Sequence, residues 1–213
     1  MSDSLHKEAR GPEREFAADE EDVLRFWFGE PGDPSLVNAA LWWKKDDAFD
    51  REIEERYEGT LERGMRGELA SWESTPRGRL ALVVLYDQLS RNMFRGTPRS
   101  FAQDSLALAI ANKAVEAGDA RVLRPIEMKF MLMPFMHAED IALQQRGVDG
   151  FIALRDAATD ASLRASFDNS LKYALMHKAI IERFGHFPHR NAILGRPTTA
   201  EEAEFLTHPH SSF

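Results

Sequence analysis

The sequence contains no cysteine. This absence excludes disulfide bonds, catalysis by a thiolate and zinc sites built on cysteine. Long hydrophobic runs are also absent, because the longest, from Leu80 to Tyr86, is far shorter than the roughly 20 residues that span a bilayer. The N-terminal segment lacks the apolar core of a secretory signal. We therefore expect a cytoplasmic protein with no membrane partner.

Positively charged residues are also fewer than negatively charged ones. The chain has 27 Lys and Arg against 35 Asp and Glu, which gives a formal net charge of −8. Because nucleic acids are polyanions, this balance argues against nucleic acid as a partner. At 213 residues, with 43% hydrophobic and 29% charged residues, the chain has the size and composition of one ordinary globular domain.

Sequence motifs of several enzyme classes are missing. There is no phosphate-binding loop, no dinucleotide fingerprint and no nucleophile elbow. No histidines are paired at the short spacings typical of metal sites. We accordingly predict no cofactor and no metal, and the sequence leaves open whether the protein is an enzyme.

Helical periodicity dominates, and no long stretch alternates apolar and polar residues. The expected helix starts are Asp19, Asp46, Thr75, Ser100, Pro125, Ser162 and Thr198, the last with Glu201 in a capping box. The helix from Pro125 is predicted to break or kink at Pro134 and to resume through His137 to Gln145.

Roughly six to nine helices joined by short turns predict an all-α protein, with antiparallel helix pairs stacked as a compact bundle or a short solenoid. No shift in composition marks a boundary between domains. We assign residues 19–206 to a single helical domain, and residues 1–18 and 207–213 to flexible tails.

The helix predicted from Thr75 changes character halfway. Residues 80–86 are apolar on every side, which is typical of a helix buried on all faces. Five hydrogen-bonding residues then fall within an arc of about 140° on a helical wheel: Asp87, Gln88, Arg91, Asn92 and Arg95. They could present guanidinium groups to an anion, or they could form a structural network in which Asp87 and Arg91 are an ion pair.

A second group of polar residues contains His137, Asp140 and Gln144. Their spacing places them on one helix face, with Glu139 pointing away. His137 could be oriented there for proton transfer, or the group could be a local hydrogen-bonding arrangement of the helix.

A third group begins with His177, which shares a face with apolar residues and is compatible with a plain core histidine. The residues His189, Arg190 and Asn191 follow the next glycine and proline in irregular backbone. Such a loop could display polar groups to a ligand or could tie down backbone carbonyls.

Two adjacent tryptophans, Trp42 and Trp43, cannot both face the core fully. Trp43 is a candidate wall for a pocket or an interface, although partial burial explains it equally well. An exposed tryptophan and the amphipathic N-terminal helix are also compatible with a homodimer.

Several motifs together resemble a known family. They are Trp72–Pro76, Asp87–Gly96, Phe101–Asp104, Pro134–Asp140, Gln144 and Phe184–Arg196. This combination, from about Val23 to Leu206, is similar to the bacterial "domain of unknown function 924" family. The resemblance implies an all-α, tetratricopeptide-like array and brings no activity with it.

The chain departs from the pattern of that family at two positions. Ser90 stands where the family pattern has proline, and His186 stands where it has arginine. If the usual arginine contacts a ligand, histidine weakens anion binding near neutral pH, because an imidazole is then only partly protonated.

Two functions are compatible with these patterns. In the first, a small anionic ligand is held by Arg91, Arg95 and Arg190. The other predicted ligand-binding residues are Trp43, Asp87, Asn92, Asp140, Gln144 and Asn191, and the candidates for proton transfer are His137, His177 and His189. In the second, a tetratricopeptide-like module binds a peptide and the polar motifs are structural. The first requires residues 87–95, 137–144 and 177–196 to meet in space.

Overall fold

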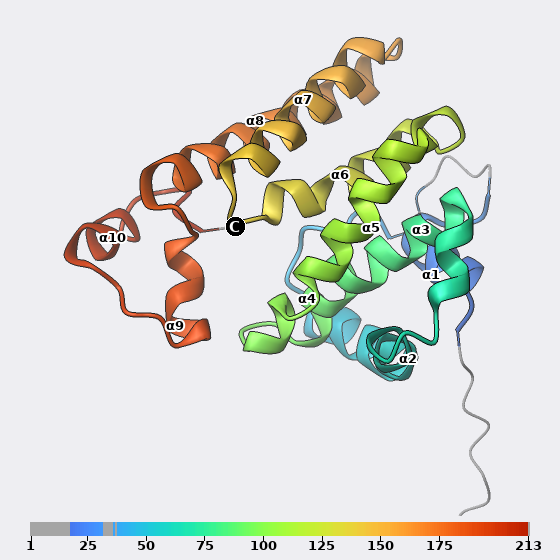
Figure 1. The fold of residues 1–213 in the computed structure, drawn as a ribbon, viewed down its shortest axis with the longest axis horizontal. Helices are drawn as coiled ribbons and strands as arrows, with labels where there is room; N and C mark the ends of the chain where they lie inside the picture. The colour runs from blue at the N-terminus through green and yellow to red at the C-terminus, as the bar shows by residue number, and fades with distance from the viewer. Residues whose placement is uncertain (1–17, 32–35, 37, 213) are drawn as a thin grey trace, which may run out of the picture.

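The computed structural model describes residues 18–31, 36 and 38–212. The predicted N-terminal tail, residues 1–18, therefore lies almost wholly outside the described residues. Within them the protein is all-α, as predicted, and no strand is present (Figure 1).

The α-helices are α1 (Glu20–Phe28), α2 (Asp47–Met65), α3 (Pro76–Val83), α4 (Ser90–Met93), α5 (Asp104–Ala117), α6 (Pro125–His137), α7 (Ile141–Ala157), α8 (Ala161–Phe184), α9 (Asn191–Leu194) and α10 (Ala200–Phe205). The 3-10 helices are η1 (Ala70–Ser74), η3 (Pro98–Phe101), η4 (Asp119–Arg121) and η5 (Pro188–Arg190). A π-helical segment, η2 (Val84–Leu89), joins α3 directly to α4.

The helix ends follow local side-chain chemistry. Asp46 and Thr75 accept hydrogen bonds from backbone N–H groups in the first turns of α2 and α3, as predicted. Gly118 and Gly185 adopt left-handed backbone at the ends of α5 and α8. The capping box of α10 is formed by Thr199 with Glu202, one residue later than predicted.

The prediction of a break at Pro134 is wrong. Pro134 lies inside α6, which continues to His137. A new helix, α7, begins after Asp140, whose side chain accepts a hydrogen bond from the N–H of Leu143. The break is therefore set by this N-cap, and His137 and Asp140 do not share a helix face.

The helices are arranged around the continuous α3–η2–α4 segment. α1, α5 and α6 pack on α3, while α2 packs on α4. From α5 to α8 each helix packs on the next in sequence, so that α5, α6, α7 and α8 form a series of stacked helices. The α7 and α8 helices run side by side as a hairpin (Figure 1).

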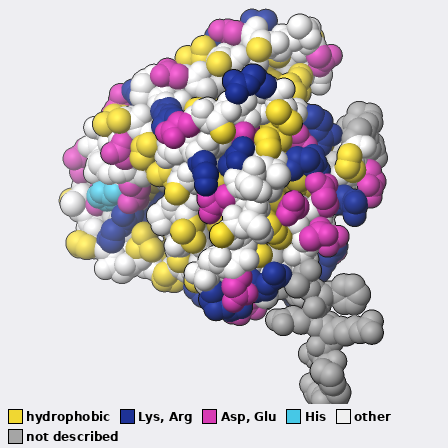
Figure 2. All heavy atoms as spheres, turned by 45° about the vertical axis from the view of Figure 1, so that its right-hand side comes forward, with side chains coloured by type: hydrophobic (Ala, Val, Ile, Leu, Met, Phe, Trp, Pro, Cys, Tyr) yellow, Lys and Arg dark blue, Asp and Glu magenta, His cyan; other side chains and the backbone are white. Residues whose placement is uncertain are grey.

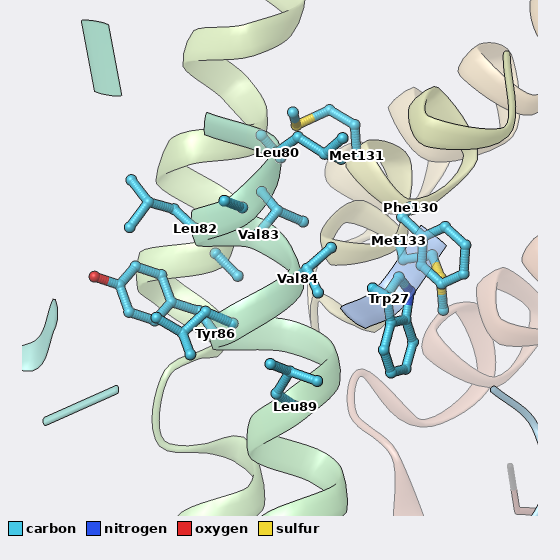
Figure 3. Close-up of a cluster of buried hydrophobic side chains, with 14 of the residues drawn as sticks. Trp27, Leu80, Leu82, Val83, Val84, Tyr86, Leu89, Phe130, Met131 and Met133 are labelled. Atoms are coloured by element: carbon cyan, nitrogen blue, oxygen red, sulfur yellow. The ribbon is translucent and has the colours of Figure 1, made fainter. Parts of the chain in front are cut away.

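The core lies where α3 and η2 meet α1 and α6. The side chains from Leu80 to Tyr86 are all buried, as the apolar run predicted. Val84 faces Trp27 and Phe130 in Figure 3, and both aromatic side chains are fully buried. Each such large side chain stabilises the fold by about 1.5–3 kcal/mol through removal of apolar surface from water.

Two contacts fix η1 and η4 on α3. A Cβ atom at Gly78 would overlap the carbonyl oxygen of Trp72, so only glycine allows this close approach. Arg79 donates two hydrogen bonds to Asp119, at 2.7 and 2.6 Å, and both side chains are buried.

The surface carries mixed charge. On the face drawn in Figure 2, acidic and basic side chains are interspersed. In the part of the chain that the structure describes, no helix has the length and apolar character needed to cross a membrane.

Candidate functional site

Asp87 and His137 meet where η2 contacts the C-terminal end of α6. Asp87 belongs to η2 and is fully buried, and His137 is the last residue of α6. The Nδ1 atom of His137 lies 2.7 Å from Oδ1 of Asp87. Arg91 Nη1 donates to the same oxygen at 2.9 Å and to the backbone carbonyl of Asp87 at 2.6 Å.

Asp104 links two arginines beside this pair. Its carboxylate lies 3.0 Å from Arg91 Nη2 and 3.1 Å from Arg190 Nη1. The Nη2 atom of Arg190 donates to the backbone carbonyl of His137 at 3.1 Å. The contacts therefore close into a ring, which we call the central cluster: Asp87, Arg91, Asp104, Arg190 and His137.

The charges of the central cluster balance, with two carboxylates against two guanidinium groups. Burial by itself raises the pKa of Asp87, but the charge of Arg91 and the contact with His137 outweigh it and lower the pKa to about 2. Burial lowers the pKa of His137, and Asp87 offsets this effect only in part. His137 is thus neutral at pH 7, with Nδ1–H donating to the Asp87 carboxylate and the Nε2 lone pair free of that contact.

Two further histidines border the cluster. The His177 ring lies 6.2 Å from the His137 ring, between centroids, and its Nδ1 atom is 2.8 Å from the carbonyl oxygen of Tyr173. Burial lowers the pKa of His177 to about 3 and that of His189 to about 4. Phe187 lies between them, with its ring centroid 5.5 Å from each imidazole.

Arg190 is held by aromatic rings as well as by charge. Its guanidinium carbon lies 4.6 Å from the Phe101 ring centroid and 4.7 Å from that of Phe187. These cation–π contacts partly replace the water that a guanidinium loses on burial. The Nε atom of Arg190 is buried and makes no hydrogen bond to the described residues.

Two of the polar residues of the 87–95 segment, Asn92 and Arg95, lie away from the central cluster. Asn92 donates to Asp50 at 2.7 Å, and Arg95 donates to the same carboxylate at 2.9 and 3.1 Å. The helical wheel placed them beside Arg91, but α4 ends at Met93, so Arg95 lies beyond the helix.

Three predicted site residues make local structural contacts instead of joining the cluster. Asp140 caps α7. The side-chain amide of Gln144 donates to the carbonyls of Met136 and Ala138, which fixes the turn between α6 and α7. The amide of Asn191 lies 3.4 Å from an oxygen of Glu202.

Trp43 lies outside the central cluster. Its side chain is 58% exposed, and its ring stacks on Phe130 with 5.8 Å between centroids. Trp42 is the member of the tryptophan pair that faces the core, and its Nε1 atom donates to the carbonyl of Trp27.

Ser90 and His186, the two residues expected to depart from the family pattern, both make defined contacts. The N–H of Ser90 reaches back five residues to the Leu85 carbonyl in the wide π turn. The Ser90 hydroxyl then donates to the Tyr86 carbonyl at 2.5 Å. His186 Nε2 lies 2.7 Å from Glu202, so this side chain ties its loop to α10.

Sequence reasoning missed two acidic residues that organise the site. Asp104 bridges the two arginines of the cluster. Glu139 binds Arg196 through two contacts of 2.7 and 3.0 Å and accepts the N–H of Phe187 at 2.9 Å. Both belong to motifs that carry the family resemblance, and that membership was the available signal.

Metal binding has no geometric support in the described ranges. Among these residues no three His, Cys, Asp or Glu side chains are placed to hold an ion together. The His137–Asp87 pair and the ring of arginines and carboxylates can therefore hold and move a proton, but they do not form a chelating site.

Comparisons with known proteins agree with the helical architecture. The family model described as "Bacterial protein of unknown function (DUF924)" matches residues 23–210. The solved structure of a protein of unknown function from Agrobacterium tumefaciens is similar, with 36% sequence identity and a TM-score of 0.75. The match covers 88% of this chain and 96% of that one. No curated protein matches.

Proposed function

Because the chain belongs to the DUF924 family of bacterial proteins of unknown function, whose name assigns no activity, we propose a function from the side chains themselves: the central cluster binds a small anionic ligand, and His137 exchanges a proton with it. The observation that carries this proposal is the 2.7 Å contact between His137 Nδ1 and Asp87 Oδ1. A carboxylate on one ring nitrogen fixes the tautomer and leaves the other nitrogen as a proton acceptor.

The burial and pKa of the pair support this role. Asp87 stays ionised because of Arg91 and His137, while His137 stays neutral because of its burial. A general base has to be unprotonated before it acts, and an oriented neutral imidazole meets that requirement. The His137 side chain keeps 12% of its surface exposed, so a small ligand can approach it.

Recognition of an anion rests on Arg190 and Arg91. Both are already paired with Asp104, so the cluster has no excess positive charge. The ligand therefore either receives a hydrogen bond from the unused Nε–H of Arg190 or replaces the Asp104 carboxylate between the arginines. Asp104 suits replacement because it is the first residue of α5 and its side chain is 21% exposed.

A thermal-denaturation screen with small carboxylates and phosphate monoesters tests the proposal. We expect at least one probe to raise the Tm of the wild-type protein and of Arg95→Gln, but not that of Arg190→Gln. The two variants are matched, because each removes an arginine that is paired with an aspartate, and only Arg190 belongs to the cluster. Circular dichroism establishes that both variants are folded.

Proton exchange is tested on His137 itself. In the wild-type protein, ¹⁵N NMR should find the proton on Nδ1 of His137 without ligand and a shifted Nε2 signal with the active probe. His137→Gln should lose the response to that probe. The proposal is wrong if no probe stabilises the protein, or if stabilisation persists in both Arg190→Gln and His137→Gln.

A second candidate function is a tetratricopeptide-like interaction module, which would bind a peptide or a second copy of the chain. The stacking of α5 to α8 in sequence order favours it, because such arrays bury a continuous core between neighbouring repeats and expose one extended face. In this case the central cluster would brace α6 against the loop after α8. Substitutions in the central cluster would then change the stability of the protein but not its affinity for the peptide or the second copy.

A further inference from the structure

Lys129 is a buried cation without an acidic partner. It lies in α6 between Met128 and Phe130, within a run of buried apolar side chains, and is only 9% exposed. Among the residues that the structure describes, no carboxylate is close enough to form an ion pair with it.

Two other parts of the chain contact the ammonium of Lys129. Its Nζ atom lies 3.4 Å from the hydroxyl of Ser166 in α8 and 5.1 Å from the ring centroid of Trp43. Trp43 is itself more than half exposed. The ammonium is therefore at the edge of the core, beside an indole that faces water.

The cost of burying the ammonium of Lys129 is not fully offset by its contacts. Burying an ammonium is unfavourable unless it is paired with an opposite charge, and a cation–π contact offsets only part of that cost. Burial lowers the pKa of Lys129 to about 8, and no charged neighbour offsets the effect. An anion beside Nζ would supply the missing counter-charge.

We propose that Lys129, Ser166 and Trp43 form a second binding site, for a small carboxylate that carries a flat apolar group. The ammonium of Lys129 pairs with the carboxylate, and the hydroxyl of Ser166, which accepts a hydrogen bond from Lys129, donates its own proton to the same group. The exposed indole of Trp43 stacks on the flat group, as aromatic side chains do in binding sites.

This site is separate from the central cluster. Lys129 and His137 are both in α6, eight positions apart in the sequence, which corresponds to about 12 Å along the helix axis. The positive charge of the central cluster is balanced by Asp87 and Asp104, whereas that of Lys129 is not balanced by any described residue. The inference is thus independent of the function proposed for the cluster.

The test measures acylation of lysine amines at pH 8 by mass spectrometry on the wild-type full-length protein, with and without benzoate. Only the neutral amine reacts, and a bound carboxylate holds the proton on Nζ. A rise in the Lys129 pKa from about 8 to about 9 lowers the neutral fraction at pH 8 by about fivefold, and a larger rise lowers it further. We expect acylation of Lys129 to slow by that factor at saturating benzoate.

Lys113 is the internal control, because it is exposed and paired with Glu73 at 2.8 Å; its rate should not respond to benzoate. Acetate, which lacks the ring, should protect Lys129 at higher concentration only. Trp43→Ala should remove this preference for benzoate, and Arg190→Gln should leave protection unchanged. The proposal is overturned if benzoate does not slow the acylation of Lys129, or if it slows the acylation of Lys113 equally. It is also overturned if Trp43→Ala keeps the preference of the wild type for benzoate over acetate.

Discussion

Asp87 and His137 are 50 positions apart in the chain and share a contact of 2.7 Å. The contact joins the middle of the α3–η2–α4 segment to the C-terminal end of α6. Because Arg91 binds the same carboxylate oxygen, one buried aspartate holds both a cation and a neutral imidazole in place. Its role in stability can be measured separately from any role in binding.

Asp87→Asn should lower the free energy of unfolding by about 3–5 kcal/mol at pH 7, the usual cost of removing one partner from a buried ion pair. Urea denaturation measures this change. Because the pKa of Asp87 is about 2, below the value near 3.9 of an unfolded aspartate, the stabilisation is present above pH 4. It disappears as the pH falls toward 2.

Asp140→Asn is the matched control, because asparagine caps a helix about as well as aspartate. Its effect should stay within about 0.5 kcal/mol. Equal losses in the two variants would contradict a special role for the charge of Asp87.

Stability should fall as the pH drops from 6.5 to 4. The pKa of His177 is lowered to about 3 and that of His189 to about 4, so the unfolded chain binds protons in this range and the folded protein does not. Each histidine contributes up to about 1.4 kcal/mol per pH unit. This stability is fully present above pH 6.5 and declines with acidification.

His177→Gln should therefore reduce the slope of unfolding free energy against pH, whatever its effect at pH 7. His208→Gln changes an exposed histidine and should leave the slope as it is. Denaturant titrations at several pH values would refute the assignment if His177→Gln kept the slope of the wild type.

The Arg79–Asp119 pair should behave as a buried brace. Asp119→Ala leaves the buried guanidinium of Arg79 without its carboxylate partner, and we expect a loss of about 3–5 kcal/mol. The double variant Arg79→Leu with Asp119→Leu should recover much of it, since no charge is then left buried. By comparison, Lys113→Ala breaks an exposed pair and should change stability by less than about 0.5 kcal/mol. An Asp119→Ala protein as stable as Lys113→Ala would contradict this view.

Gly78→Ala should destabilise the protein although alanine favours helices. The propensity gain is about 1 kcal/mol, but the new Cβ would overlap the Trp72 carbonyl. Since backbone yields less readily than a side chain, we expect a net loss of about 1–3 kcal/mol, seen as a lower Tm. A higher Tm would show that η1 can move away.

Much of the fold could be predicted because helix ends are encoded locally. Asp46, Thr75, Gly118 and Gly185 each act through neighbouring backbone groups, so short sequence windows identify them. The predicted break at Pro134 is wrong because the proline removes a single backbone hydrogen bond near the end of α6, and the helix continues past it. The actual break depends on the capping side chain of Asp140.

The candidate site was predictable only in part. Arg91 and Arg190 stood out as donors, but the carboxylate that joins them, Asp104, comes from a third segment. Which acid an arginine binds depends on packing between distant helices, and one sequence does not contain that information. Lys129 offered a weaker signal, a single charge within an apolar run.

The wide turn of η2 also changes the phase of the helical wheel for Asn92, whereas Arg95 lies beyond the end of α4. A wheel assumes about 100° per residue throughout, and one π turn resets the phase of everything that follows. Asp87 contacts both His137 and Arg91, while Asn92 contacts Asp50.

Because of the π turn, the number of residues in the segment 84–89 determines which side chains of α4 reach the central cluster, as much as the residue types do. Deleting one codon there would remove a single buried side chain and keep the helical character of the segment, yet rotate α4 against α3 by about 100°. Arg91 would turn away from Asp87, and Asn92 from Asp50. In an alignment of relatives, a gap of one position in this segment would mark a protein with a different central cluster, even where every motif letter is retained.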